Sequence, residues 1–285
     1  MSVFYKGFIT FFILFLFVSC SHKKESGLRV ATYNSHYMEG GLSNIILTLR
    51  ESKAEVIALQ EVLVTGQTPT SAAIAAALGY YHIHSATYVQ RQNDAWCLSI
   101  LSKYPISNFR DTGIGTSRKA LSAEIKMKNQ SITVITMHLT PLSGRPPVKE
   151  EILRRLARRK QEIQDLLTFA KKINTPLILM GDFNMLRGTF GLWGMDEYDM
   201  LLDAGFQDAD GGFFLTNYDT FPLPEQTIDS IARTIPRFLV PKSVTLDYIF
   251  LSGQIKKKNT LIMKSGASDH WPLIADIIVY DENKE

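Results

Sequence analysis

Apolar runs typical of β-strands recur along most of the chain, separated by turn residues. They cover residues 28–32, 56–59, 95–101, 120–127, 132–137, 177–180, 246–251 and 273–279. Helical patterns lie between several of these runs, at residues 42–52, 71–78 and 149–172. Because strands are mixed with helices along the chain, the pattern predicts an α/β layered domain and not a helix bundle.

The longest helical pattern has one apolar stripe at 3.6 residues per turn. The stripe contains Ile152, Leu156, Ile163, Leu167 and Ala170. Four arginines mostly point away from it: Arg154, Arg155, Arg158 and Arg159. We interpret them as a solvated helix face, and a contact with nucleic acid or phospholipid is the alternative.

The N-terminus differs from the rest of the chain. Residues 1–19 hold one charge, Lys6, and the apolar run 8–18, which is too short to span a bilayer and is typical of a signal peptide. The run ends before Cys20 and a polar stretch, which resembles a bacterial lipoprotein signal. We therefore expect a signal peptide at 1–19, a lipidated Cys20 and a tether at 20–27. Ordinary secretion with a chance cysteine is the alternative.

Taken as a whole, the chain has the composition of a globular protein, with 285 residues of which 45% are hydrophobic and 21% charged. No composition break divides it, so we expect one domain at 28–285 and a monomer in the cell envelope. If Cys20 is lipidated, Cys97 is the only thiol left and no internal disulfide can form. The net charge of +3 neither requires nor excludes a polyanionic partner.

A proline-containing segment at 220–243 carries several large apolar residues, among them Phe221 and Phe238. Long connections of this kind are often binding loops. Packed irregular structure is the equal alternative.

Polar side chains stand where several of the predicted strands end. Glu61 closes the run 56–60, and Asn34 follows Ala31-Thr32-Tyr33. Asp182 and Asn184 follow the run 177–180 through Gly181, which allows a tight exit. Carboxylate and amide oxygens at such positions suit a hard cation such as Mg²⁺. Taken singly, Glu61 is more typical of a surface charge at a strand end, and Asn34 or the Asp182–Asn184 pair could be turn residues.

Two histidines stand at comparable positions. His138 ends the run 132–137, and His270 follows Asp269 just before the last strand. An imidazole titrates near neutral pH and suits proton transfer, and Asp247 is the best candidate to orient His270. Each histidine alone could be merely structural.

Taken together, these residues resemble the endonuclease/exonuclease/phosphatase superfamily, whose members are DNase I-like. The resemblance covers about residues 28–280 and rests on Gly181-Asp182-Phe183-Asn184 and Ser268-Asp269-His270, with Asn34, Glu61, His138 and Asp247 in order along the chain. Ser102-Lys103-Tyr104-Pro105 and Leu246-Asp247-Tyr248 also match. The connection before Asp247 is longer than usual in that family.

The resemblance implies a four-layered α/β sandwich with two mostly antiparallel sheets packed face to face and helices outside. It implies Mg²⁺ or Mn²⁺ as cofactor, with Glu61, Asn34 and Asp269 as ligands. It gives catalytic roles to His138, Asp182, Asn184, Asp247 and His270, and leaves open whether Asp182 or His270 is the general base. It also implies that Arg118 faces the phosphate.

We therefore expect a membrane-tethered phosphodiesterase that acts on nucleic acid or on a phospholipid or sphingolipid head group by in-line attack of water. A small phosphate ester is a further option. The alternative from another class is a non-catalytic binding lipoprotein that keeps the fold. That alternative predicts loss of one or two metal ligands, and the sequence retains the whole set.

Overall fold

The computed structural model describes residues 25–90, 94–128, 130–141, 149–186, 196–210, 219–233 and 236–280. The predicted signal peptide, Cys20 and the first part of the predicted tether lie outside these ranges. β1 begins at Glu25, three residues before the expected start of the domain. Within the described ranges, no helix has both the length and the apolar character needed to cross a bilayer.

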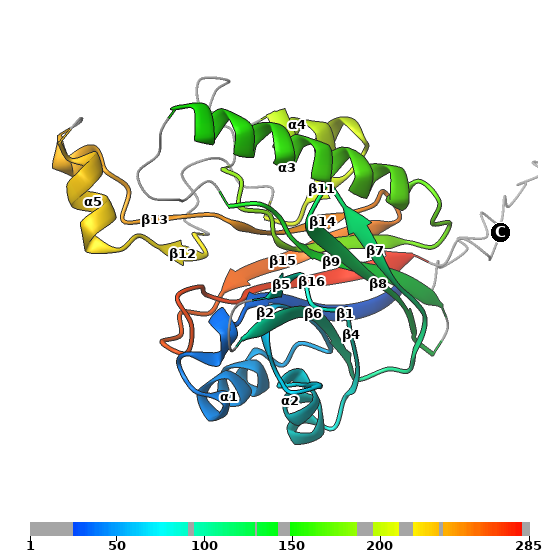
Figure 1. Ribbon diagram of the computed structural model, residues 1–285. Coiled ribbons are helices and arrows are strands. Elements are labelled where there is room, and N and C mark those ends of the chain that lie inside the picture. Colours follow the sequence, from blue (N-terminus) through cyan, green and yellow to red (C-terminus); the bar gives the residue numbers. More distant parts are fainter. Residues whose placement is uncertain are drawn as a thin grey trace, which may run out of the picture.

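Two sheets form the centre of the molecule (Figure 1). The first sheet has the order β15 (Ile255–Ile262), β16 (Leu273–Tyr280), β1 (Glu25–Asn34), β2 (Val56–Thr65), β6 (Ala95–Ser102) and β4 (Tyr81–His84), with β3 (Thr68–Pro69) and β5 (Val89–Gln90) attached. The second has the order β11 (Gln207–Asp208), β14 (Asp247–Leu251), β10 (Leu177–Asp182), β9 (Ser131–His138), β8 (Arg118–Lys126) and β7 (Ile106–Ile114). β1 and β2 run parallel, as do β9 and β10, and the other neighbours are antiparallel.

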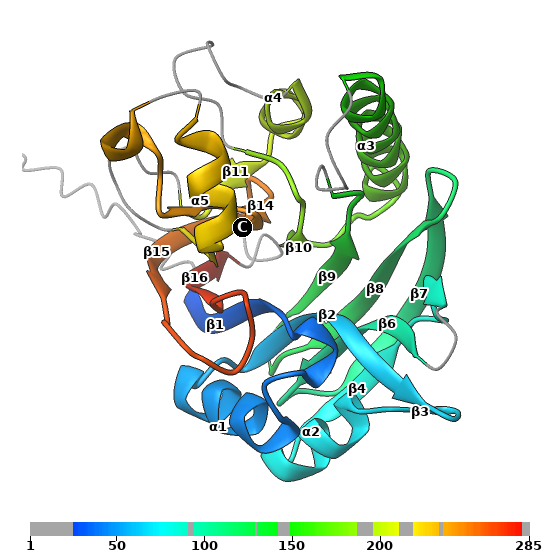
Figure 2. The ribbon, with the colours of Figure 1, turned by 60° about the vertical axis from the view of Figure 1, so that its left-hand side comes forward.

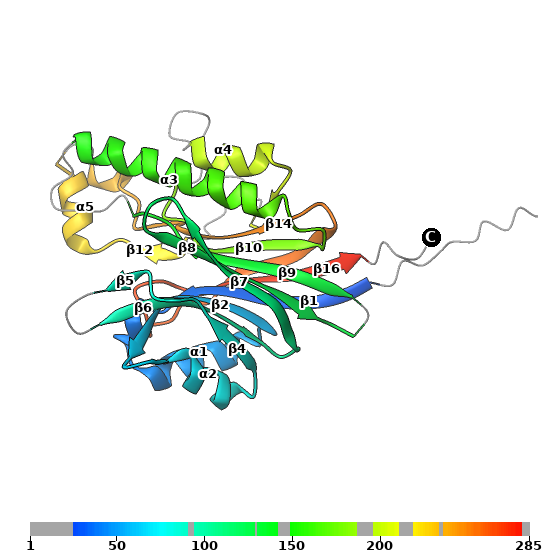
Figure 3. The ribbon, with the colours of Figure 1, turned by 45° about the vertical axis from the view of Figure 1, so that its right-hand side comes forward.

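The sheets pack face to face, and helices cover both outer faces (Figure 3). Side chains from both inner faces form the central core, including Val30, Ile100, Val134 and Ile178. Helices α1 (Leu42–Ser52) and α2 (Ser71–Leu78) cover the first sheet, and α3 (Lys149–Ala170) and α4 (Asp196–Asp203) cover the second. The predicted four-layered α/β sandwich is confirmed, because each sheet buries one face against the other sheet and one against helices.

The predicted strands and helices all form, whereas two long strands escape the sequence pattern. β7 and β15 lie at sheet edges and expose half or more of their residues, so neither has the apolar run of a buried strand. One prediction for α3 is wrong. Arg159 is fully buried and does not belong to a solvated face, because it pairs with Glu197 of α4 at 3.0 Å (Nε to Oε1).

The proline-containing segment forms an arm at the rim of the sandwich (Figure 2). We use "the arm" for residues 219–233 and 236–244. It contains the strand pair β12 (Phe221–Pro222) and β13 (Ser243–Val244), helix α5 (Glu225–Ile231) and the 3₁₀ helix η2 (Arg237–Leu239). Ile228 and Val240 are buried, whereas Phe238 is 85% exposed. The arm is therefore partly packed and partly presents apolar side chains to solvent.

Candidate active site

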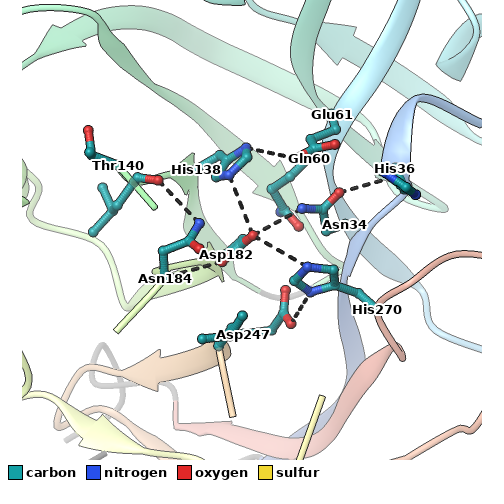
Figure 4. Close-up of polar contacts among 12 residues, drawn as sticks. Asn34, His36, Gln60, Glu61, His138, Thr140, Asp182, Asn184, Asp247 and His270 are labelled. Carbon is teal, nitrogen blue, oxygen red and sulfur yellow. Dashed lines mark hydrogen bonds and ion pairs between the residues drawn. The ribbon is translucent and has the colours of Figure 1, made fainter. Parts of the chain in front are cut away.

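The ends of five neighbouring strands meet at one edge of the sandwich, and the predicted site residues stand there (Figure 4). Asp182 lies opposite His138 of β9 and opposite Asp247 of β14 in the register of the second sheet. In the first sheet Asn34 lies opposite Gln60, next to Glu61. The strand registers therefore bring together residues that are as far apart in sequence as Asn34 and Asp247.

Gly181 allows the close approach of β9 and β10 beside Asp182. A Cβ atom at this position would lie 2.2 Å from the backbone oxygen of Met137. No side chain fits into that space without separating the strands. The glycine of the Gly-Asp-Phe-Asn segment is therefore required by packing between strands, in addition to any effect on the turn.

The Asp182 carboxylate occupies the centre of the cluster. Its Oδ2 accepts a hydrogen bond from Nδ2 of Asn34 at 3.0 Å, and Nε2 of His138 lies 3.5 Å from the same oxygen. Nε2 of His270 lies 3.8 Å away. Asp182 is almost fully buried, and this burial raises the pKa of its carboxyl group. A carboxylate with a raised pKa and several converging N–H groups is well placed to accept a proton.

Glu61 stands in a β-bulge of β2, where the register against β6 shifts between Leu59 and Val62. Its φ of +51° lies in the left-handed region, which is strained for a residue with a Cβ atom and is often found at functional sites. The bulge re-aims the side chain toward the cluster. Burial and the nearby Asp182 carboxylate raise the pKa of Glu61 to about 7.

Tyr88 connects Glu61 with His138. Its hydroxyl accepts a hydrogen bond from the backbone N–H of Glu61 at 3.2 Å and lies 3.0 Å from Nδ1 of His138. Burial lowers the pKa of His138 to about 3, so the ring is neutral at physiological pH. Donation of the hydroxyl proton to Nδ1 satisfies both partners and leaves the ring proton on Nε2, which faces Asp182.

Asp247 orients His270 as the sequence suggested. Its Oδ2 lies 2.8 Å from Nδ1 of His270, and Phe221 of the arm packs on the same ring with centroids 4.8 Å apart. Burial lowers the pKa of His270, but the carboxylates of Asp247 and Asp182 outweigh burial and raise it to about 10. His270 is therefore a buried cation next to Asp182.

Asn184 and Arg118 lie at the edge of the cluster. The backbone N–H of Asn184 donates to Oδ1 of Asp182 at 2.9 Å, and its Nδ2 donates to the carbonyl of Leu139 at 3.2 Å. The guanidinium of Arg118 lies 5.7 Å from the centre of the Tyr88 ring. Its Nη1 is buried and, in the described part of the chain, has no hydrogen-bond partner. A buried guanidinium nitrogen without a hydrogen-bond partner suits an anionic ligand.

The predicted metal ligands differ in their placement. Asn34 and Glu61 lie in the cluster, whereas Asp269 is exposed at the rim, with Oδ1 3.5 Å from Nδ1 of His36. Another group offers three ligand atoms within 4.8 Å of one another, namely Asp182, Asp247 and His270. Within that group Nδ1 of His270 is bonded to Asp247, and a pKa raised to about 10 makes the ring a cation that does not bind a metal, so we favour the Glu61 side.

The residues at the Glu61 side fit a hard divalent cation. The Asp182 carboxylate contributes to the raised pKa of Glu61, and a nearby cation would relieve this repulsion between the two carboxylates. On the His270 side of Asp182, Oδ1 of Asp247 is also buried and has no hydrogen-bond partner among the described residues. Oxygen donors of this type are those that Mg²⁺ and Mn²⁺ prefer.

Several residues of the cluster have no recognisable signal in the sequence. Tyr88 lies in an irregular stretch, and Gln60 is a buried amide whose Nε2 donates to Thr136 at 2.9 Å, linking the two sheets. The Thr220 hydroxyl accepts a hydrogen bond from the backbone N–H of Asp247 at 3.1 Å. Their roles depend on contacts between distant segments, which no local pattern reports.

Comparison with known proteins identifies the family. The model of the endonuclease/exonuclease/phosphatase family matches residues 31–270. The chain resembles an endonuclease/exonuclease/phosphatase from Beutenbergia cavernae, with TM-score 0.67, 14% identity, and coverage of 89% of this chain and 72% of that one. It also resembles an AP endonuclease from Archaeoglobus fulgidus, with TM-score 0.63, 18% identity, and coverage of 89% of this chain and 99% of that one. For the human nocturnin catalytic domain the TM-score is 0.61 and the identity 18%, with coverage of 90% of this chain and 96% of that one.

A search of curated proteins found no match. The structural likenesses are all below 25% identity and therefore concern the fold alone. The family model, in contrast, spans most of the chain and includes every predicted catalytic and metal-binding residue, from Asn34 to His270. The chain belongs to the endonuclease/exonuclease/phosphatase family, whose members act on phosphoester bonds.

Proposed function

We propose that the protein is a divalent-metal-dependent phosphodiesterase that cleaves its substrate by in-line attack of water. The observation that carries this proposal is the convergence of Glu61, His138, Asp182 and His270 on one buried point. The unpartnered Nη1 of Arg118 lies beside it. Acid, base and phosphate-binding groups are therefore within reach of a single phosphoryl group.

Glu61 and Asn34 would hold the cation, with Asp269 contributing from the rim. A bound Mg²⁺ or Mn²⁺ would supply positive charge that stabilises the phosphoryl oxygens in the transition state. Glu61 stays available for this role because its strained bulge fixes the direction of its side chain.

Asp182 is the proposed general base. Its raised pKa favours proton uptake, and the Asn184 N–H holds Oδ1 at 2.9 Å, so that Oδ2 faces the substrate side. His270 is protonated at neutral pH because its pKa is raised to about 10, and a protonated imidazole cannot accept the proton of water. We therefore assign His270 to the phosphate as a cationic clamp that Asp247 orients.

Three further groups would bind the phosphoryl oxygens or the leaving group. Nε2–H of neutral His138 is a donor that Tyr88 holds in place through Nδ1. The side-chain amide of Asn184 and the guanidinium of Arg118 would also donate hydrogen bonds to these oxygens. Donors that are fixed before substrate binds stabilise developing charge without reorganisation.

Nucleic acid and lipid head groups are the two substrate classes we propose. A nuclease binds the phosphate backbone, and its activity falls steeply with salt. The arm favours the lipid class as a second candidate, because Phe238 is 85% and Leu239 59% exposed and Phe221 of the same arm contacts His270. Exposed apolar side chains beside a site could enter a bilayer surface.

Hydrolysis of plasmid DNA, sphingomyelin and bis-p-nitrophenyl phosphate, measured in parallel with Mg²⁺ and Mn²⁺, tests the proposal. Added chelator and Asp182→Ala are the controls. Turnover of any substrate that both controls abolish would support the phosphodiesterase and identify its substrate class. A folded wild-type protein that hydrolyses none of the three and binds no metal would instead favour the non-catalytic binding lipoprotein.

We also propose that Cys20 carries a lipid that tethers the enzyme to a membrane of the cell envelope. The support is the sequence pattern around Cys20. Labelling of cells with a palmitate analogue would show incorporation into the wild-type protein and none into Cys20→Ala. Equal labelling of both proteins would contradict the tether.

A further inference from the structure

Helix α3 carries two buried charged side chains that face the site loops. Arg159 is 0% and Glu162 1% exposed, and they stand three residues apart on one helix. Burial of a charge is costly unless hydrogen bonds and an opposite charge compensate for it. The partners of these two side chains are therefore informative.

Arg159 holds the backbone of Asn184. Its Nε donates to Oε1 of Glu197 on α4 at 3.0 Å, and its Nη1 donates to the carbonyl oxygen of Asn184. Asn184 has a φ of +49°, in the left-handed region that non-glycine residues adopt at a cost. The carbonyl contact therefore helps to keep Asn184 in a conformation that its own backbone does not favour.

Glu162 holds the neighbouring loop. Its carboxylate accepts the backbone N–H of Thr140 at 2.9 Å and the Thr140 hydroxyl at 2.6 Å. Thr140 follows His138 by two residues, at the point where the chain leaves β9. The Asn184 amide bonds to Leu139 between them, so the two loops are also joined directly. Figure 4 shows Asn184 next to Asp182, with Thr140 farther out on the same side of the cluster.

We propose that Arg159 and Glu162 are positioning residues, which set the direction in which Asn184 and His138 meet the substrate. This inference rests on the proposed function, because it concerns the orientation of groups that would contact the phosphoryl oxygens. α3 thereby orients the site residues without contacting the substrate, through the Asn184 carbonyl and the Thr140 N–H. The opposing explanation is that the Arg159–Glu197 pair only stabilises the packing of α3 against α4.

The double substitution Arg159→Met/Glu197→Met separates the two explanations. It removes both charges together, so neither is left buried alone, and side chains of similar length keep the helices packed. It also leaves the Asn184 carbonyl without its donor. Arg159→Lys is the conservative variant, and Arg158→Met, at an exposed position one residue away, is the matched control.

We expect the double variant to fold with wild-type circular dichroism and to lose about 10–100-fold in kcat with little change in KM, since a small displacement of a reacting group is costly. Arg159→Lys should recover part of the loss, and Arg158→Met should behave as wild type. In NMR spectra the Asn184 side-chain amide, assigned by its loss in Asn184→Asp, should shift in the double variant and not in Arg158→Met.

A folded double variant with kcat within twofold of wild type and an unshifted Asn184 amide would overturn the inference. Glu162→Gln, which keeps one acceptor oxygen, provides a second test with an expected loss smaller than that of the double variant; an unchanged kcat would contradict the positioning role of Glu162. If the wild-type protein hydrolyses none of the substrates, the proposed function fails. The amide shift would still report whether Arg159 orients Asn184.

Discussion

Substitution of Tyr88 by phenylalanine tests how His138 and Glu61 are held. The change removes one oxygen atom and retains the ring, whose edge-on contact with His138 has a centroid distance of 5.8 Å. Two hydrogen bonds depend on that oxygen, from the Glu61 N–H at 3.2 Å and to Nδ1 of His138 at 3.0 Å. In Tyr88→Phe the Glu61 N–H and Nδ1 of His138 would both stay in place but lose their hydrogen-bond partner.

The expected loss of stability follows from these two bonds. A typical intramolecular hydrogen bond contributes about 0.5–1.5 kcal/mol net, and an unsatisfied buried group costs about 1–3 kcal/mol. Glu61 is half-buried and His138 is buried, so we expect a decrease of about 1–3 kcal/mol in the free energy of unfolding. The His138 ring also loses the group that fixes its tautomer, for which the expected loss of activity is about 10–100-fold.

Urea unfolding and turnover of bis-p-nitrophenyl phosphate would measure the two effects. Tyr81→Phe is the matched control, because Tyr81 is 55% exposed and lies on the edge strand β4. If Tyr88→Phe changed stability by less than about 0.5 kcal/mol, the range of ordinary surface substitutions, and left turnover unchanged, the assignment of the Tyr88 hydroxyl would be wrong.

Three further predictions concern packing, ion pairing and the arm. Gly181→Ala should lower the free energy of unfolding by about 1–3 kcal/mol, since its Cβ would meet the Met137 oxygen at 2.2 Å, while Gly253→Ala, which has open space, should be neutral in the same urea titration. Hydrogen bonds of 2.6 and 2.9 Å from Arg29 hold the pKa of the Asp276 carboxyl below its ordinary 3.8. The ion pair therefore stabilises the fold above pH 3.8, and this stabilisation is lost as the pH falls and Asp276 becomes protonated. Asp276→Asn should therefore be less stable than wild type at pH 7, and unfolding midpoints that differ equally at pH 7 and pH 3 would contradict this. Phe238→Ser/Leu239→Ser should reduce turnover of sphingomyelin in vesicles and leave bis-p-nitrophenyl phosphate unaffected; equal effects on both would remove the arm from substrate binding.

The layered fold can be predicted from the sequence because its buried strands are continuous apolar runs. β6, β9 and β10 are buried over most of their length, and such runs are visible without any knowledge of their neighbours. β15 begins Ile255-Lys256-Lys257-Lys258, which has no such signal. Lysines on an edge strand prevent pairing with other chains, so the feature that protects the edge also hides the strand.

The site could be predicted only as far as its residues stand in local motifs. Asp182, Asn184 and His270 each follow or precede a recognisable strand, and the structure brings them together. Arg159 was assigned to the surface because helical periodicity alone cannot report a partner on another helix, here Glu197. The exposed placement of Asp269 likewise depends on the course of the loop after β15, which no spacing reveals.

Metal binding measured together with turnover tests the central claim most directly. Mn²⁺ binding, followed by electron paramagnetic resonance, and hydrolysis of bis-p-nitrophenyl phosphate should be compared in the wild-type protein and Glu61→Gln. We predict that the wild-type protein binds Mn²⁺ and hydrolyses the ester, and that Glu61→Gln remains folded and loses both properties. Wild-type activity that survives in Glu61→Gln with unchanged Mn²⁺ affinity would contradict a catalytic metal at Glu61.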